Sequence, residues 1–83
     1  MEVKIFTKKD CPKCPPAKDL GEILLSRGYN VFFFDIGTID GLTEAQFYGV
    51  MATPTILILK DSQEIKSWRG ETPTIDEIEK YLK

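Results

Sequence analysis

The sequence contains no histidine and only two cysteines, Cys11 and Cys14, among its 83 residues. Without histidine, no Ser/His or Cys/His pair can activate a nucleophile, and no imidazole can bind a metal. Two cysteines are also too few for a site in which four thiolates of one chain hold a metal. These absences leave the two cysteines themselves as the candidate functional groups.

Strong charge of one sign and long apolar runs are also absent. Eleven lysines and arginines against thirteen aspartates and glutamates give a net charge of −2, which argues against nucleic acid as the main partner. No stretch approaches the ~20 apolar residues of a membrane span, and the first residues do not resemble a signal peptide. We therefore expect a cytoplasmic monomer with no membrane contact and one domain over residues 1–83.

The first half of the chain has the pattern of a strand, a helix and a second strand. A short apolar-polar run at residues 3–6 predicts the first strand. Residues 31–36 are apolar at nearly every position, which is typical of a strand buried on both faces, as in a parallel pair covered by helices. Between them, helical spacing that ends at Gly28 predicts one apolar helix face, formed by Ala17, Leu20, Ile23 and Leu24. Together these elements predict a right-handed βαβ unit.

A short helix and a hairpin come next. Thr43 is a candidate N-cap for a helix over residues 44–48, which Gly49 ends. Residues 55–59 give the strongest strand pattern in the chain, and a turn joins them to an alternating strand at 64–68.

The last element is a helix that Thr74 and Glu77 begin as a capping box. Its single apolar stripe consists of Ile75, Ile78 and Leu82. The predicted order, β-α-β-α-β-β-α, gives an α/β fold with a mixed four-stranded sheet flanked by helices.

Cys11 and Cys14 stand at the junction of the first strand and the first helix. Residues three apart on a helical turn lie about 5–6 Å from each other, and a disulfide requires Cα atoms about 5.5 Å apart. The pair can therefore open and close with little movement of the backbone. The N-terminus of a helix carries unpaired N–H groups and a partial positive charge, so we expect a lowered pKa for a cysteine placed there.

The two positions predict different roles. Cys11 comes first, at the exposed edge of the turn, so we expect it to be the thiolate that attacks a disulfide, with Cys14 as the buried thiol that resolves the mixed disulfide. Three prolines crowd this turn; they are compatible with a helix that begins near Cys14, and such a late start weakens the effect of the helix on Cys11. Positive charge opposed only by Asp10 surrounds the motif, on Lys4, Lys8, Lys9, Lys13 and Lys18.

Other roles for the cysteine pair stay open at this point. Two cysteines can be buried as small hydrophobic residues without reactivity. The C-x-x-C spacing also serves zinc and iron–sulfur sites, so two chains could share a metal or cluster in a dimer. A non-catalytic binding module is a third alternative. The position of the pair after the first strand of a βαβ unit favours a redox role.

A second motif, Thr53-Pro54, stands immediately before the strongest predicted strand. A proline there must begin the strand or bend the chain into it, because it donates no hydrogen bond to a sheet. A first strand, a Cys-Pro-x-Cys motif, a βαβ unit and a Thr-Pro dipeptide before an antiparallel strand resemble the thioredoxin superfamily. The run over residues 7–14 is most similar to its small glutaredoxin-like members, and the resemblance covers essentially the whole chain.

The resemblance implies a thioredoxin fold and a thiol–disulfide oxidoreductase that uses no bound cofactor. Pro54 corresponds to the family's cis-proline beside the cysteine pair, and the backbone of Thr53 to the group that binds an extended substrate. Lys8 corresponds to the glutaredoxin lysine that contacts the glutathione carboxylate. Lys13 replaces the aromatic residue usual in glutaredoxins, and we place it with the substrate-binding residues.

The same resemblance implies the partners. The substrates are expected to be proteins with disulfides, and the reductant either glutathione or a flavin-dependent thioredoxin reductase. Gly70 alone precedes Glu71 where the family has a glycine pair and an acid, so glutathione binding stays open. Trp68 is similar to a tryptophan of small redoxins that donate electrons to ribonucleotide reductase; packing on an edge strand is the other interpretation.

Overall fold

The computed structural model describes residues 1–83, and its helices and strands follow the order that the sequence predicts. None of the three helices combines the length and the apolar content that crossing a membrane requires. The elements are β1 (Glu2–Thr7), α1 (Cys14–Ser26), β2 (Asn30–Asp35), α2 (Ile39–Phe47), β3 (Thr55–Lys60), β4 (Gln63–Arg69) and α3 (Ile75–Leu82).

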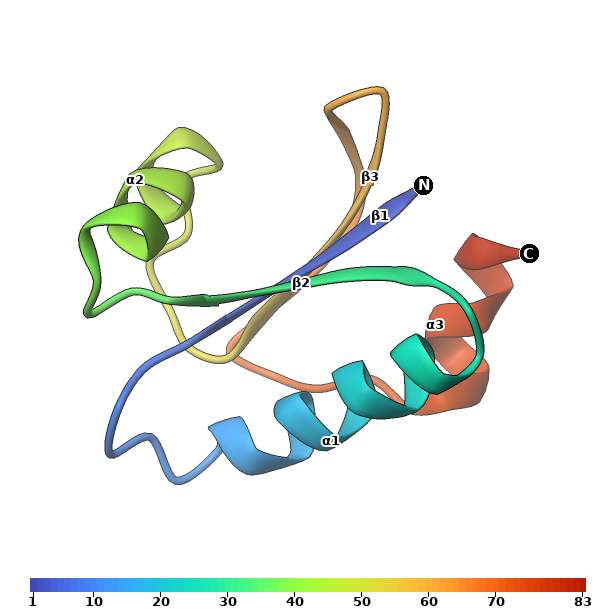
Figure 1. The fold of residues 1–83 in the computed structure, drawn as a ribbon, viewed down its shortest axis with the longest axis horizontal. Coiled ribbons are helices and arrows are strands. Elements are labelled where there is room, and N and C mark those ends of the chain that lie inside the picture. The colour runs from blue at the N-terminus through green and yellow to red at the C-terminus, as the bar shows by residue number, and fades with distance from the viewer.

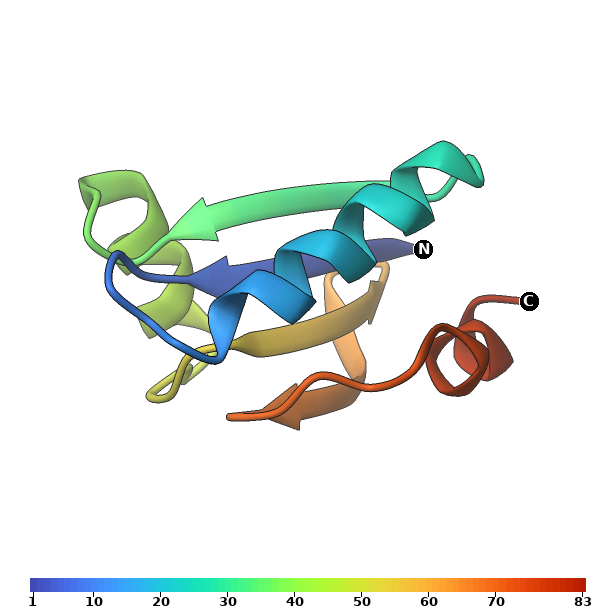
Figure 2. The same ribbon diagram turned by 90° about the horizontal axis from the view of Figure 1, so that it is seen from below.

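The four strands form one sheet in the order β2-β1-β3-β4. β1 and β2 run parallel, while β3 runs antiparallel to β1 and pairs with β4 in a hairpin. α1 and α3 cover one face of the sheet and α2 the other (Figure 1, Figure 2). The expected mixed four-stranded sheet is therefore confirmed. Because β1 lies inside the sheet, the chain that carries Cys11 leaves from the middle of one end of the sheet.

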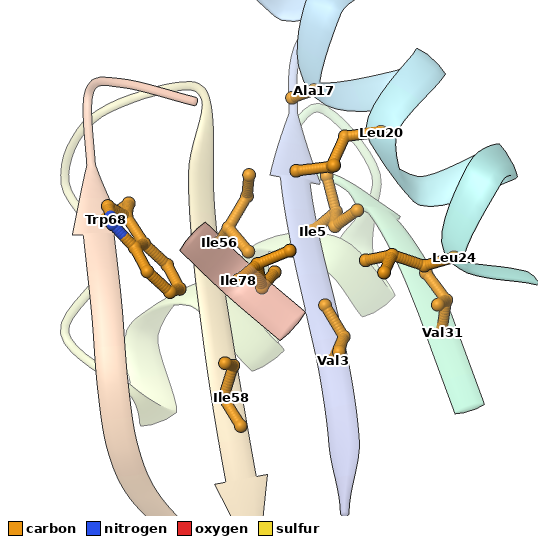
Figure 3. Packing of buried hydrophobic residues seen from close by; sticks show 10 residues of the cluster. All are labelled: Val3, Ile5, Ala17, Leu20, Leu24, Val31, Ile56, Ile58, Trp68 and Ile78. Atoms are coloured by element: carbon orange, nitrogen blue, oxygen red, sulfur yellow. The ribbon is translucent and has the colours of Figure 1, made fainter. Parts of the chain in front are cut away.

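The larger core lies between the sheet and the layer formed by α1 and α3 (Figure 3). Full burial of a large apolar side chain contributes about 1.5–3 kcal/mol, so this cluster holds α1, the helix that begins at Cys14, against the sheet. Trp68 is buried in it, which supports the packing interpretation of this residue. The ten buried members are Val3, Ile5, Ala17, Leu20, Leu24, Val31, Ile56, Ile58, Trp68 and Ile78.

The exposure of β2 corrects one expectation. Its parallel pairing with β1 is present, and Val31 lies beside Val3, but the strand is not buried on both faces. Phe32 is 44% exposed and Phe33 42%. The physical reason is that β2 is the outermost strand of the sheet and has a neighbouring strand on one side only.

The start of α2 corrects a second expectation. The N-cap is Thr38, whose hydroxyl accepts a hydrogen bond from the Gly41 N–H at 3.0 Å. Thr43 lies inside the helix, and its hydroxyl donates to the carbonyl of Ile39. Thr38 serves as the N-cap because its backbone is extended, with ψ of 160°, as an N-cap residue requires.

The buried face of α1 differs from the expected stripe at one position. Ile23 is 43% exposed, and Gly21 is buried in its place. A Cβ at Gly21 would collide with the Phe33 ring and the Ile5 side chain. The glycine therefore lets α1 lie close to β1 and β2, at the cost of helix propensity.

A buried carboxylate ties α3 to the end of α1. Glu79 is 7% exposed and accepts hydrogen bonds from the Arg27 guanidinium at 2.8 Å and the Tyr29 hydroxyl at 3.0 Å. Burial by itself raises the pKa of Glu79, but the hydrogen bonds from Tyr29 and Arg27 outweigh it and hold the pKa below its usual value of 4.5.

We expect Glu79→Gln to destabilise the fold at neutral pH, because an amide has no charge to pair with Arg27. Since the pKa is lowered in the folded state, the carboxylate stabilises the protein fully above pH 4.5, and this contribution is lost as the pH falls through the folded-state value. Denaturant unfolding at neutral pH and in acid measures the difference in free energy between wild type and variant. Glu22→Gln, on the exposed side of α1, is the control. A difference for Glu79→Gln that does not shrink in acid would contradict this assignment.

Candidate active site

Cys11 and Cys14 form a disulfide just beyond the end of β1. Their Cα atoms are 5.4 Å apart, as the C-x-x-C spacing predicts. Cys14 is the first residue of α1 and is 2% exposed, whereas Cys11 lies in the preceding loop and is half-buried. The more accessible residue is therefore the one expected to attack a substrate.

The N-terminus of α1 lies next to this disulfide. The helix begins at Cys14 with Lys13 as its N-cap. This is the late start with which the three prolines are compatible. Pro15 and Pro16 fill the first turn, where a proline is tolerated but supplies no N–H. The N–H of Cys14 donates to the carbonyl of Cys11 at 3.2 Å. This terminus thus offers a thiolate fewer free N–H groups than an ordinary helix, and nearby lysines have to contribute more.

Four of the five lysines expected near the motif do surround it. Lys8, Lys9 and Lys18 line a shallow hollow together with both cysteines, and Lys13 lines a second hollow beside Cys11. All four lysines are exposed. Asp10 is the only acidic residue that lines either hollow. Positive charge in excess favours a thiolate over a thiol.

Lys4 is the fifth lysine, and the structure corrects its place. Its Nζ donates to Glu44 Oε1 at 2.5 Å and to the Tyr48 hydroxyl at 3.4 Å. Burial lowers the pKa of Lys4, but the hydrogen bonds to Glu44 and Tyr48 outweigh burial and raise the pKa above its usual value. Lys4 therefore belongs to the contact between β1 and α2 and not to the basic residues around the cysteines.

The Thr53-Pro54 motif lies beside the cysteine pair. The peptide bond between the two residues is cis, and the carbonyl of the buried Pro54 accepts a hydrogen bond from the Gly70 N–H at 2.7 Å. Thr53 is half-buried and lines the same hollow as Cys11. In Figure 2 the loop that precedes β3 lies at the same end of the sheet as the loop that follows β1. The fold thus brings together two motifs that are far apart in the sequence.

Two residues of this region, Arg69 and Met51, were not predicted from the sequence. The guanidinium of Arg69 donates to the carbonyls of Gly49 at 3.1 Å and Tyr48 at 3.4 Å, and so holds the segment that leads to Thr53. Met51 lines the hollow beside Cys11. No local pattern marks either residue, because Arg69 contacts a segment that is distant in the sequence and only the fold brings Met51 near Cys11.

This arrangement can perform a two-electron exchange between a dithiol and a disulfide, because both sulfurs already lie where the bond forms. Nowhere in the structure do three or more His, Cys, Asp or Glu side chains come together as they do around a metal. A metal at the cysteine pair would therefore have to take further ligands from a second chain.

Comparisons with known proteins agree with this geometry. Residues 1–83 match the family described as the thioredoxin domain. The chain is similar to thioredoxin from Methanocaldococcus jannaschii, with 32% identity over 66 residues that cover 78% of each protein. A probable thioredoxin from Archaeoglobus fulgidus is 32% identical over 57 residues, which cover 68% of this chain and 63% of that one.

A solved structure, thioredoxin 1 from Thermosipho africanus, shares the fold with a TM-score of 0.77 and 24% identity, covering 99% of this chain and 94% of that one. The family match spans residues 1–83 and is not limited to the cysteine motif. The chain therefore belongs to the thioredoxin domain family, and its fold carries the cysteine pair of a thiol–disulfide oxidoreductase.

Proposed function

We propose that the protein reduces disulfides in other proteins, as a thioredoxin-type reductase. The observation that carries this proposal is the accessible Cys11, with buried Cys14 behind it, beside free backbone groups. Neither the N–H nor the C=O of Thr53 is bonded to another backbone group. An extended substrate segment can pair with these two groups in the way that an added strand pairs with a sheet edge.

The proposed cycle has two steps. The thiolate of Cys11 attacks one sulfur of the substrate disulfide, forms a mixed disulfide and releases the other substrate sulfur, which takes up a proton. Cys14 then loses its proton and its sulfur attacks Sγ of Cys11, which releases the second substrate thiol. The substrate gains two electrons and two protons, and the protein ends in the disulfide form that the structure contains.

Lysines replace histidine in the proposed activation. Lys8 and Lys13 both line one of the two hollows that contain Cys11, so their charge favours its thiolate. The same two side chains face an incoming substrate. We therefore assign them to both thiolate stabilisation and substrate binding.

The reductant is proposed to be a flavin-dependent thioredoxin reductase. Similarity to proteins named thioredoxin supports this choice, as does Lys13 at the place of the glutaredoxin aromatic residue. Gly70 stands alone before Glu71, which also departs from the glutathione-binding pattern. Ribonucleotide reductase gains no support as the target, because Trp68, which suggested it, is buried in the core.

Insulin reduction with two electron sources tests the proposal. We expect turnover with NADPH and a thioredoxin reductase, and none above background with glutathione, NADPH and glutathione reductase. Turnover with the glutathione system and none with thioredoxin reductase would mean that the protein is of the glutaredoxin type. If stoichiometric, prereduced protein leaves insulin intact, the function itself is wrong and a binding module is favoured. A stoichiometric metal in a dimer purified without oxygen would favour the bridged alternative.

A further inference from the structure

Of the two hollows that Cys11 lines, the one that also contains Lys13 combines two kinds of side chain. Ile36 and Met51, from the segments after β2 and before β3, form what we call the apolar side. Lys8 and Lys13, from the loop between β1 and α1, form the basic side. A substrate that reaches Cys11 through this hollow meets both sides.

Met51 is 96% exposed, the highest value among the large apolar residues of the chain. Single exposed apolar residues are common on protein surfaces, but this one lines the hollow of the reactive sulfur. Val50, next to it, packs against the smaller core, whereas the Met51 side chain contributes almost no buried area to the fold. An unbranched, polarisable side chain adapts to differently shaped apolar partners, which suits a residue that meets many substrates.

The basic side gives the hollow an excess of positive charge. The chain as a whole has a net charge of −2, yet Lys8 and Lys13 line this hollow against Asp10 alone, and Lys9 and Lys18 lie at the adjoining one. A partner whose charge complements this patch is steered toward it, and a basic partner is repelled. The complementary partner is acidic.

We propose that the preferred substrates are proteins whose disulfide is flanked by an apolar side chain and by acidic side chains. The apolar side chain packs on Met51 and Ile36, and the acidic side chains pair with Lys8 and Lys13. This inference rests on the proposed function, because it specifies which protein disulfides the same site reduces. Met51 is then a specificity-determining residue.

The test uses short synthetic peptides with one cysteine, each joined to a second copy of itself by a disulfide. The peptides combine Leu or Ser on one side of the cysteine with Glu or Lys on the other. Excess reduced protein releases one peptide thiol when Cys11 attacks and the second when Cys14 displaces it. Chromatography of the released peptide gives the rate. Division by the rate with dithiothreitol corrects for the intrinsic reactivity of each disulfide.

We expect the Leu/Glu peptide to react about tenfold faster than the Ser/Lys peptide, since one apolar contact and one complementary charge each favour it. High salt should reduce the preference for Glu over Lys and leave the preference for Leu over Ser.

Variants separate the two sides. Met51→Gln should lower the Leu-over-Ser ratio, and the double variant Lys8→Gln/Lys13→Gln the Glu-over-Lys ratio. Each ratio is taken within one variant, so a general change in reactivity or folding cancels. Ile65→Gln and Lys60→Gln are matched controls, because both residues are exposed and lie outside the hollow; they should keep both ratios.

A second probe, 2-hydroxyethyl disulfide, distinguishes two kinds of failure. If the protein reduces this small neutral disulfide but treats all peptides alike, the inference is wrong and the proposed chemistry stands. Ratios that survive Met51→Gln and the double lysine variant would also overturn it. If neither the peptides nor 2-hydroxyethyl disulfide is reduced, the proposed function fails.

Discussion

Replacement of Cys11 by serine is expected to reduce insulin-reductase activity to the background rate measured without protein. A serine hydroxyl does not ionise near neutral pH and cannot form a disulfide with the substrate, so the first step of the cycle has no nucleophile. The remaining thiol, Cys14, is 2% exposed and is a poor substitute. Activity is measured with NADPH and a thioredoxin reductase.

Cys14→Ser is the matched variant for this prediction. It keeps the accessible Cys11, so the first step proceeds, but it lacks the thiol that releases the substrate. Turnover is lost while the mixed disulfide accumulates. Near-normal turnover of Cys11→Ser, at equal protein concentration and with an unchanged circular dichroism spectrum, would contradict the assigned roles.

Gly41→Ala is expected to lower the free energy of unfolding by about 2–3 kcal/mol, or the melting temperature by roughly 10–20 °C. A Cβ at Gly41 would overlap the carbonyl oxygen of Asp35, a backbone atom. That carbonyl cannot move away easily, because the N–H of Thr38 donates to it at 3.0 Å and the Thr38 hydroxyl at 2.7 Å. The start of α2 would have to shift.

Gly28→Ala separates this collision from the ordinary effect of replacing a glycine. Gly28 has φ of +90° and nothing within 4 Å of its added Cβ, so only the left-handed backbone is penalised, by about 1–2 kcal/mol. Thermal unfolding of the two variants gives the comparison. A melting temperature for Gly41→Ala that is no lower than that for Gly28→Ala would contradict this prediction. It would show that the start of α2 can shift away from the Asp35 carbonyl at little cost.

Features that depend on nearby residues could be predicted from the sequence. The cysteine spacing fixes the separation of Cys11 and Cys14, since both lie on one turn. The hairpin turn at Asp61 and Ser62 was also predictable, and both residues have positive φ. The mixed four-stranded sheet followed because a βαβ unit and a hairpin each have few allowed arrangements.

Features that depend on distant segments could not be predicted in this way. An apolar run at residues 31–36 does not show whether the strand lies inside the sheet or at its edge. In the structure β2 is an edge strand. Lys4 was expected near the cysteines because it is near them in sequence, but its partner Glu44 is 40 residues away and lies on α2.

The candidate site also contains both residues that local motifs predict and residues that only the fold brings near. Both cysteines and Thr53-Pro54 stand in recognisable motifs, so sequence alone located them. Met51 lines the hollow beside Cys11 and Arg69 contacts the segment before β3, and the place of that segment is a property of the whole fold. Residues that reach a site only through the fold are harder to find from the sequence than residues that stand in its motifs.

The rate at which each single-serine variant forms a mixed disulfide with the same substrate, followed by mass across a range of pH, tests most directly whether Cys11 is the attacking thiolate. Cys14→Ser, which keeps Cys11, should form the adduct rapidly, with a midpoint below the pKa of about 8.5 of a free cysteine. Cys11→Ser should form it far more slowly. Equal rates for the two variants, or a midpoint at or above about 8.5 for Cys11, would contradict the assignment.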